Sequence, residues 1–329
     1  MADLSIIIVN WKSATCLDTC LRTIRENSEG LNYEIIVVDN ASYDGSEAVA
    51  GRFGEAVHFV QSTENLGFAR ANNLGATYSH GVVLLFLNPD TEIQGNAMNL
   101  LYDQFRKLPD PGVVGCRLLN SNGSLQTSCV QSLPTILNQV LDAEVLRSWF
   151  PRSALWGTAA FYDDKEASEV EAVSGACMMI RREVFDLVGG FSSEYFMYGE
   201  DLDLCFKARR AGYRNYHVRN AIVLHHGGGS SRQARSDLSI TMMRESVRLF
   251  LRKSHGVFYS DCYRATLGIA AVLRMAVLIL LFPAWAIFRG TREWSGSFRK
   301  WTAILRWGLG LAAKPKRGEL KSCAESAAN

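Results

Sequence analysis

Several patterns are missing from the sequence, and their absence narrows the class of protein. Proline is scarce, with 7 residues in 329, and the 27 glycines follow no three-residue period, which excludes a collagen-like chain. No repeat of about 20 to 50 residues is visible, so a solenoid is not expected. Because 48% of the residues are hydrophobic and 21% are charged, we expect a folded chain with one large domain or two smaller ones.

The eight cysteines include no CxxC pair, and no spacing with histidine completes a zinc site. Most of them have apolar neighbours, which is typical of reduced, buried thiols. A basic leader is also absent, and the apolar run Leu4–Val9 is short and β-branched. This run predicts a buried strand rather than a signal peptide, so we expect the folded body to stay on the cytoplasmic side.

Charge is unevenly distributed along the chain. Arg244 to Lys321 contains 15 Lys and Arg but 4 Asp and Glu, although the whole chain has a net charge of +2. A basic C-terminal quarter therefore follows an acidic body, which favours contact with an anionic partner such as a membrane surface. Nucleic acid is disfavoured, because the aromatic residues of this region lie on an apolar helix face rather than on a stacking platform.

The first 90 residues alternate between strand and helix patterns. Apolar runs predict strands at Leu4–Asn10, Glu34–Asp39, Val57–Val60 and Val82–Leu87. Between them, the spacing of apolar residues predicts a helix after a candidate N-cap at Ser13 and a second helix at Gly67–Tyr78. Strands separated by helices imply βαβ units and an α/β fold, with a mostly parallel sheet flanked by helices.

After about Val113 the pattern is less regular. Asn120–Gly123 predicts a turn between two short strands, and residues 130–170 predict an insertion with some helix. Beyond them we expect a strand at Ala172–Ile180, a helix at Glu200–Ala211, a short strand at Ile222–Leu224 and a mobile glycine-rich loop over 225–231.

The C-terminal region is apolar and basic. Residues 265–288 contain one charged residue, Arg274, and one proline, Pro283. Because a charge at the centre of a membrane span is costly, we favour a re-entrant or interfacial segment over a complete span. Residues 292–309 interleave large apolar residues with arginine and lysine, which predicts a basic amphipathic helix in the headgroup plane. The alternative is a helix packed on the body or on a second subunit.

Acidic residues follow two of the predicted strands. Asp39 ends the second strand, and Asn88-Pro89-Asp90 follows the fourth. Ligands of α/β folds bind outside the carboxyl ends of the strands. There a carboxylate can accept a hydrogen bond from a ribose hydroxyl or a base N–H, or hold a divalent cation between phosphates. The alternatives are a turn-stabilising role for Asp39 and helix capping for Asp90.

Two later segments also carry ionisable side chains. Glu200-Asp201-Leu202-Asp203 opens a predicted helix after three aromatic residues, where a carboxylate with a raised pKa could act as a general base. The alternative is that these acids only complement the helix dipole. His225 follows a predicted strand, where it is either structural or, together with an acid, a metal ligand.

In this order the motifs resemble those of the family 2 glycosyltransferases with a GT-A fold, and most closely the rhamnosyltransferase-like branch. The matching segments are Ile7–Trp11, Val37–Ser46, Asn65–Asn73, Leu85–Asp90, Tyr198–Leu204 and His225–Ser230. The resemblance implies a GT-A catalytic domain over 1–235, with a nucleotide-sugar-binding half at 1–110 and an acceptor half at 111–235. A helical, membrane-associated region would follow at 236–329.

The resemblance also implies roles for individual residues. Asp201 would be the catalytic base, and Asp90 and His225 would hold Mg²⁺ or Mn²⁺, with His226 close enough to compete. The donor-binding residues would be Asn10, Asp39, Asn65, Gly67, Arg70, Asn88 and Asp90. The acceptor region would include Glu200, Tyr198 and Gly175. The DxD metal motif of the family reads Asn88-Pro89-Asp90 here, so the site has one negative charge fewer.

The implied activity is that of an inverting, metal-dependent glycosyltransferase. L-rhamnose from dTDP-rhamnose is favoured over glucosyl, galactosyl or galactofuranosyl donors. The acceptor would be a hydroxyl of a glycan or a polyprenyl-diphosphate-linked glycan in cell-surface polysaccharide synthesis. The basic tail would hold the enzyme at the cytoplasmic face of the inner membrane.

Two other functions compete with this one. A nucleotidyltransferase would need a glycine-rich, basic phosphate loop where Asn10–Ser13 stand. A non-catalytic, membrane-associated scaffold of a glycan-assembly complex would have lost Asp90 or Asp201, and both are present. The sequence leaves open whether chains form a homo-oligomer.

Overall fold

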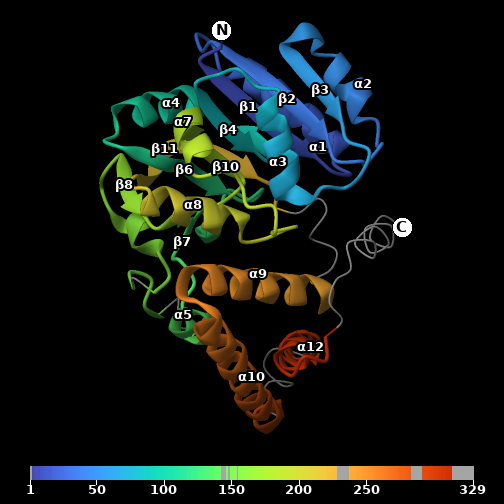
Figure 1. Cartoon of the computed structure of the whole chain (residues 1–329), viewed down its shortest axis with the longest axis vertical. Coiled ribbons are helices and arrows are strands. Elements are labelled where there is room, and N and C mark those ends of the chain that lie inside the picture. The colour runs from blue at the N-terminus through green and yellow to red at the C-terminus, as the bar shows by residue number, and fades with distance from the viewer. Residues whose placement is uncertain are drawn as a thin grey trace. The chain divides into compact units, whose positions relative to one another are not determined.

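The chain divides into two compact units. The computed structural model describes residues 2–141, 146, 149–153, 155–227, 237–282 and 291–312. One unit comprises Met1–Leu133 and Trp149–Arg232, and the other comprises Pro134–Ser148 and Gln233–Asn329 (Figure 1). Parts of four predicted segments lie outside the described residues: the insertion over 130–170, the glycine-rich loop over 225–231, the apolar segment 265–288 and the basic tail beyond residue 312.

The first unit is built on a nine-stranded sheet. Its strand order is β3-β2-β1-β4-β10-β6-β11-β5, with β8 paired to β11. The first four neighbours in this order are mutually parallel, as predicted, and lie side by side in Figure 1. β10 enters antiparallel between β4 and β6, whereas β6 and β11 are parallel. The strands are β1 (Leu4–Asn10), β2 (Tyr33–Asp39), β3 (Val57–Gln61), β4 (Val83–Leu87), β5 (Thr91–Ile93), β6 (Pro111–Leu119), β8 (Ala167–Val170), β10 (Cys177–Arg181) and β11 (Arg214–His225).

Helices connect and cover these strands. The helices of this unit are α1 (Ala14–Glu26), α2 (Ser46–Gly51), α3 (Gly67–Thr77), α4 (Ala97–Lys107), α7 (Arg182–Leu187) and α8 (Glu200–Arg210), with short 3-10 turns at Gly54–Ala56, Thr127–Cys129 and Thr158–Tyr162. Ile7 and Phe86, in β1 and β4, are fully buried, as expected for strands covered on both faces. Ser13 precedes α1 but makes no capping bond: its Oγ donates to Trp11 O at 3.0 Å, and Asp44 Oδ2 accepts from Ala14 N, also at 3.0 Å.

Two predicted strands differ from the structure. Ala172–Ile180 is broken into β9 (Ala172–Val173) and β10, because the small residues Ser174–Ala176 form a turn in which Cys177 N donates to Ser174 O at 3.4 Å. The short strand expected at Ile222–Leu224 is the end of the 12-residue β11. β9 pairs with β7 (Val130–Gln131) in a separate two-stranded sheet.

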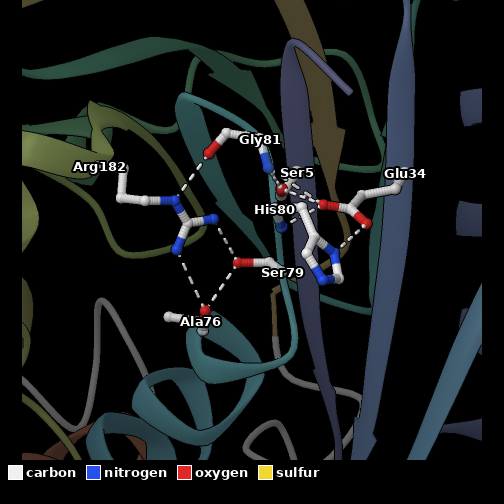
Figure 2. A network of polar contacts seen from close by, with 7 residues as sticks. All are labelled: Ser5, Glu34, Ala76, Ser79, His80, Gly81 and Arg182. Atoms are coloured by element: carbon white, nitrogen blue, oxygen red, sulfur yellow. Dashed lines mark hydrogen bonds and ion pairs between the residues drawn. The ribbon is translucent and has the colours of Figure 1, made fainter. Parts of the chain in front are cut away.

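A polar network closes the amino end of the parallel strands (Figure 2). Ser5 and Glu34 are register partners near the starts of β1 and β2, and Ser5 Oγ donates to Glu34 Oε1 at 2.6 Å. Gly81 N donates to both side chains, and His80 Nδ1 lies 3.2 Å from Glu34 Oε2. Burial alone would raise the pKa of Glu34, but these hydrogen bonds lower it below its ordinary value.

Arg182 extends this network to α3. Its guanidinium donates to Gly81 O and Ser79 Oγ, both at 2.8 Å, and to Ala76 O at 3.3 Å (Figure 2). Because Ala76 lies in the last turn of α3, the positive charge also complements the C-terminal end of the helix dipole. The network therefore fixes the connection between α3 and β4, at the end of the strands away from the acidic motifs.

The second unit is helical. Its elements are α5 (Ile136–Leu141), α9 (Asp237–His255), α10 (Val257–Leu280) and α12 (Thr291–Gly308). α10 is long and apolar enough to cross a membrane, which by itself is weak evidence that it does. Arg274 is held within the unit, since it donates to Val140 O at 2.7 Å and lies 4.4 Å from the centre of the Trp301 ring.

The amphipathic helix expected in the headgroup plane packs in part on its own unit. Ile304 and Trp307 of α12 are buried, and the Trp307 ring lies 5.7 Å from that of Tyr263 in α10. Arg264 Nε donates to Trp307 O and Gly308 O, both at 3.2 Å. This face of α12 therefore packs on α10 of the same unit.

Candidate active site

The carboxyl ends of β1 and β2 bring Asn10 and Asp39 side by side. The two are register partners, and Asn10 Nδ2 donates to Asp39 Oδ1 at 2.9 Å. Asp39 Oδ2 accepts from the backbone of Ser42 and Tyr43 and from Gln61 Nε2. Burial alone would raise the pKa of Asp39, but its hydrogen bonds lower it, so the side chain is a carboxylate. These contacts match the turn-stabilising alternative, because they order the loop after β2.

Several non-glycine residues with positive φ lie in the loops that follow β1 and β2 and precede α8. They are Lys12 after β1 (51°), Ala41 and Tyr43 after β2 (59° and 49°) and Tyr198 before α8 (73°). Among the described residues, Asp110 is the fifth non-glycine residue of this kind. Such conformations cost free energy and tend to occur where function requires a particular loop shape.

Asn65 and Gly67 shape the loop before α3. Asn65 Oδ1 accepts from Asn40 Nδ2 at 3.0 Å and from Gly67 N at 2.9 Å. Gly67 has a φ of +76°, and a Cβ there would lie 2.4 Å from Phe196 O, so a side chain is excluded. The loop is thereby tied both to Asn40, which follows Asp39, and to the segment that precedes α8.

Asp90 and His225 face each other where β5 pairs with the end of β11. His225 Nε2 lies 3.3 Å from Asp90 Oδ1 and 3.2 Å from Asn88 Nδ2. The side chains of His225 and Asp90 are only 14% and 12% exposed. His226, the competing candidate, contacts Glu92 Oε1 at 2.6 Å instead. The side chains of the two histidines therefore contact different acids, and the side chain of His225 is the one beside Asp90.

The pair formed by Asp90 and His225 fits a divalent cation. A carboxylate oxygen and an imidazole nitrogen are both ligands that such ions accept, and phosphate oxygens of a substrate commonly supply further ligands. Within the described ranges, no three or more His, Cys, Asp or Glu side chains are grouped to hold a metal ion. The described residues therefore offer two ligands rather than a complete cage.

Asp201 lies in the first turn of α8, against the turn that interrupts the predicted strand. Its Oδ2 accepts from Gly175 N at 3.1 Å and from Gln131 Nε2 at 3.3 Å, and its Oδ1 accepts from Leu202 N at 2.8 Å. Desolvation raises the pKa of Asp201, and these hydrogen bonds oppose the rise. A carboxylate with a raised pKa is a stronger base than an ordinary one.

The turn Ser174–Ala176 connects the two groups of candidate residues. Gly175 N donates to Asp201, and Ala176 O accepts from Asn88 N at 3.0 Å. Asn88 in turn contacts His225. The residues that interrupt the strand therefore position both the candidate base and the candidate metal site.

The other acids of the motif have different surroundings. Glu200 is 6% exposed, and its Oε2 is a buried atom without a hydrogen-bond partner among the described residues. Burial and the neighbouring Asp201 raise the pKa of Glu200 to about 8. Burial and Glu200 likewise raise the pKa of Tyr198. Asp203 instead accepts from Ser192 Oγ at 2.5 Å, so it supports the preceding loop.

The structure brings most, but not all, of the predicted site residues into contact with one another. Three groups form: Asn10 with Asp39, Asn88 and Asp90 with His225, and Gly175 with Asp201. Arg70 forms an ion pair with Glu64 at 3.3 Å on the surface, outside these groups.

Two glutamines that the sequence did not single out complete the site. Gln126 Oε1 lies 2.8 Å from His225 Nδ1, and Gln131 Nε2 donates to Asp201. Both follow the predicted turn at Asn120–Gly123, in the part of the sequence beyond Val113 where the pattern is less regular. Glutamine is common on protein surfaces, so only the fold reveals these contacts.

Sequence comparisons agree with this geometry. The profile of Glycosyl transferase family 2 matches residues 5–189, and that of Glycosyl transferase family group 2 matches residues 135–313. The chain is 30% identical over 260 residues to N-acetylglucosaminyl-diphospho-decaprenol L-rhamnosyltransferase of Mycobacterium tuberculosis, which covers 74% of this chain and 83% of that protein. It is 22% identical over 257 residues to Rhamnosyltransferase WbbL of Escherichia coli, with 75% and 92% covered.

Solved structures show the same fold. The mannosyltransferase PcManGT from Pyrobaculum calidifontis, in complex with GDP-Man and Mn²⁺, matches with a TM-score of 0.59 and 18% identity over 94% of this chain and 87% of its own. GalNAc-T7 with UDP, GalNAc and Mn²⁺ matches with a TM-score of 0.54 and 15% identity over 80% and 50%.

The predicted GT-A fold class is thus confirmed. Within this class the chain belongs to glycosyltransferase family 2, and it is similar to the rhamnosyltransferases of that family.

Proposed function

We propose that the chain is an inverting glycosyltransferase that transfers L-rhamnose from dTDP-rhamnose to a hydroxyl of a polyprenyl-diphosphate-linked glycan in cell-surface polysaccharide synthesis. The name of the mycobacterial relative supports both the sugar and the class of acceptor. The structural observation that carries the proposal is the turn Ser174–Ala176, which bonds to Asp201 on one side and to Asn88, next to the Asp90–His225 pair, on the other. A base and a phosphate-side site held by one turn are what such a transfer needs.

Asp201 has the role of general base. It takes the proton of the acceptor hydroxyl, whose oxygen attacks the anomeric carbon from the face opposite the diphosphate, and this single displacement inverts the anomeric centre. The hydrogen bonds from Gly175 and Gln131 fix the carboxylate, and its raised pKa brings its basicity closer to that required near neutral pH. Glu200, Tyr198 and Gly175 line the acceptor side of Asp201 in this proposal.

The loops at the ends of β1, β2 and β4 bind the donor. Asp39 and Asn10 order the loop after β2, and Asn65 with Gly67 orders the loop before α3, so the nucleotide is bound by preformed loops. Asp90 and His225, which lie beside Asn88, would hold Mg²⁺ or Mn²⁺. When bound, the cation supplies charge neutralisation for the departing diphosphate.

The helical unit supplies membrane association in this proposal. α10 carries exposed apolar side chains at Ile269, Leu273 and Leu280, which lie on one helical face, and Arg274 has partners inside the unit. Attachment at the cytoplasmic face of the inner membrane would bring the enzyme to a lipid-linked acceptor.

The proposal is tested with purified full-length protein and a panel of dTDP-, UDP- and GDP-sugars, each with Mg²⁺, Mn²⁺ or EDTA. We expect turnover of dTDP-rhamnose that EDTA abolishes. Asp201→Asn should lower kcat by about 10²–10⁴-fold while donor binding survives, because only the base is lost. Asp90→Ala should weaken binding of the cation and of the donor.

Glu183→Gln is the matched control, because this glutamate is exposed on α7 and forms a surface ion pair with Arg181. It should keep the activity of the wild type. Turnover of a different donor would support the proposed glycosyltransferase activity but contradict the proposed donor sugar. A folded protein that binds no donor would reject the catalytic proposal in favour of the scaffold.

A further inference from the structure

Gln126 lies behind His225, on the side of the ring away from Asp90. Gln126 Oε1 is 2.8 Å from His225 Nδ1, whereas His225 Nε2 is 3.3 Å from Asp90 Oδ1. The imidazole is therefore held by an amide at one nitrogen and faces a carboxylate at the other. A neutral imidazole has one N–H, so the partner that accepts this proton decides what the second nitrogen can bind.

A chain of hydrogen bonds fixes the direction of the Gln126 amide. Ser124 Oγ donates to Asn122 Oδ1 at 2.7 Å, so it accepts from Asn120 Nδ2 at 2.9 Å. Asn120 Oδ1 is then the acceptor for Gln126 Nε2 at 3.3 Å. An amide whose nitrogen is used in this way presents its oxygen to His225, and Gln126 Oε1 accepts the proton of Nδ1.

The backbone that carries these hydrogen-bonded side chains is also held in place by hydrogen bonds. Asn120 N donates to Ser124 O and Gly123 N donates to Asn120 O, both at 2.8 Å, which closes the turn. At Gly227, just after the histidines, a Cβ would lie 3.3 Å from Gln126 Nε2, so glycine leaves room for the amide. The position of Gln126 is thus set from both sides.

Protonation at Nδ1 leaves a lone pair on His225 Nε2. Asn88 Nδ2, at 3.2 Å, can donate to this lone pair, but Asp90 Oδ1 at 3.3 Å cannot. Two acceptor atoms that face each other repel unless a cation lies between them. Two neighbouring ligands of an octahedral ion bound at about 2.1 Å are about 3.0 Å apart, which is close to the observed separation.

We infer that Gln126 is a positioning residue for the metal site: its carbonyl accepts the Nδ1 proton of His225 and so directs the Nε2 lone pair toward the cation beside Asp90. The inference rests on the proposed function only in taking His225 as a metal ligand. Partners of this kind typically change metal affinity by about 10–100-fold.

The first test reads the tautomer without any metal. Full-length protein labelled with [¹⁵N]histidine is observed by long-range ¹H–¹⁵N NMR in EDTA at alkaline pH, with the signal assigned by His225→Asn. We expect the Nδ1–H tautomer in the wild type. In Gln126→Leu we expect the Nε2–H tautomer, because Asp90 Oδ1 then offers an acceptor at 3.3 Å from Nε2 and the acceptor at Nδ1 is gone. Gln126→Glu should retain Nδ1–H, since a carboxylate also accepts this proton.

The second test measures the affinity for Mn²⁺ alone by electron paramagnetic resonance. Gln126→Leu should weaken binding by about 10–100-fold, and Gln126→Glu should stay within about threefold of the wild type. Gln104→Leu is the control, because Gln104 contacts Glu166 on the surface. If Gln126→Leu does not fold, Asn120→Ala replaces it, since loss of this acceptor frees the amide to rotate and should also weaken Mn²⁺ binding.

An Nε2–H tautomer in the wild type would overturn the inference, and so would a Gln126→Leu protein with unchanged tautomer and Mn²⁺ affinity. Failure of the proposed metal site has a different signature, since Asp90→Ala and His225→Ala would then leave Mn²⁺ binding unchanged.

Discussion

At the scale of single residues, Glu200 is an acid that the folded protein keeps protonated. Burial and the adjacent Asp201 raise its pKa to about 8, well above its ordinary value of 4.5. Between these two values the unfolded chain releases this proton and the folded chain does not. Glu200 therefore lowers the free energy of unfolding as pH rises from about 4.5 to about 8, and its full contribution to stability is present only below that range.

Glu200→Gln removes this dependence, because an amide of the same shape does not ionise. We expect the variant to match the wild type near pH 4.5 and to be more stable by roughly 1–4 kcal/mol at pH 9. Urea denaturation across this pH range measures the difference. Glu183→Gln, on the exposed surface, should follow the wild type at every pH. A constant difference between Glu200→Gln and the wild type would show that Glu200 does not titrate in this range.

Gln131 makes a second prediction at this scale. Its amide donates to Asp201 Oδ2 at 3.3 Å and so favours the ionised carboxylate. Gln131→Leu should raise the pKa of Asp201 further and move the acid limb of the kcat profile to higher pH by about half a unit to one unit. Activity would then fall more at pH 6 than at pH 8. A uniform loss at all pH values would mean that Gln131 contributes only to packing.

The residues that the sequence singled out differ in physical character from those that it did not. Asp39, Asp90 and Asp201 follow or open regular elements, and an acid at such a place is informative because it is costly to bury. Gln126 and Gln131 lie in a segment of mixed turns and short strands, and their roles depend on contacts with residues about 70 to 100 positions away. No local pattern encodes a contact at that distance.

At the scale of elements, apolar runs predicted strands and helices well where they were continuous. β1 was predicted with its observed bounds, and α1 begins, as predicted, directly after Ser13. The failures have specific causes. The strand expected at Ala172–Ile180 breaks because Gly175 turns its N–H toward Asp201, a local departure that serves the site rather than the sheet. β11 was predicted too short because its first half, near Tyr216 and His217, includes polar residues that are buried by pairing with β8.

The network around Arg182 makes a prediction about the junction of α3, β4 and β10. Arg182 donates three hydrogen bonds, two of them to backbone carbonyls, from a half-buried position. Arg182→Met keeps most of the apolar stem but removes these bonds, and we expect a loss of about 1–3 kcal/mol in the free energy of unfolding. Urea denaturation measures it.

The neighbouring Arg181 provides the control for this prediction. It forms an exposed ion pair with Glu183 at 3.4 Å, so Arg181→Met should cost less than about 1 kcal/mol. Arg182→Met should also leave Mn²⁺ affinity unchanged, because the network lies at the amino ends of the strands. Equal losses in the two variants would show that the bonds of Arg182 add nothing beyond a surface charge.

At the scale of the whole molecule, α10 presents an exposed apolar face. The side chains of Ile269, Leu273 and Leu280 are 62%, 63% and 78% exposed, and they share one helical face. The helix is long enough to span a bilayer, but its composition alone does not distinguish a membrane from a second subunit. The charge of Arg274 was the sequence argument against insertion. In the structure its guanidinium contacts Val140 O and the Trp301 ring, so this charge has partners within the unit.

Replacing Ile269, Leu273 and Leu280 together by glutamate decides between these partners. If the face contacts lipid, the triple variant should lose flotation with vesicles of anionic phospholipid, because buried apolar area drives interfacial binding. High salt should release the wild type only in part, since apolar contact is not screened. Leu187→Glu, an equally exposed leucine on α7, is the control and should float as the wild type does. Light scattering tests the alternative that the face binds a second copy of the chain. In that case the triple variant should still float but change from oligomer to monomer. The basic region would then be the part that contacts the membrane.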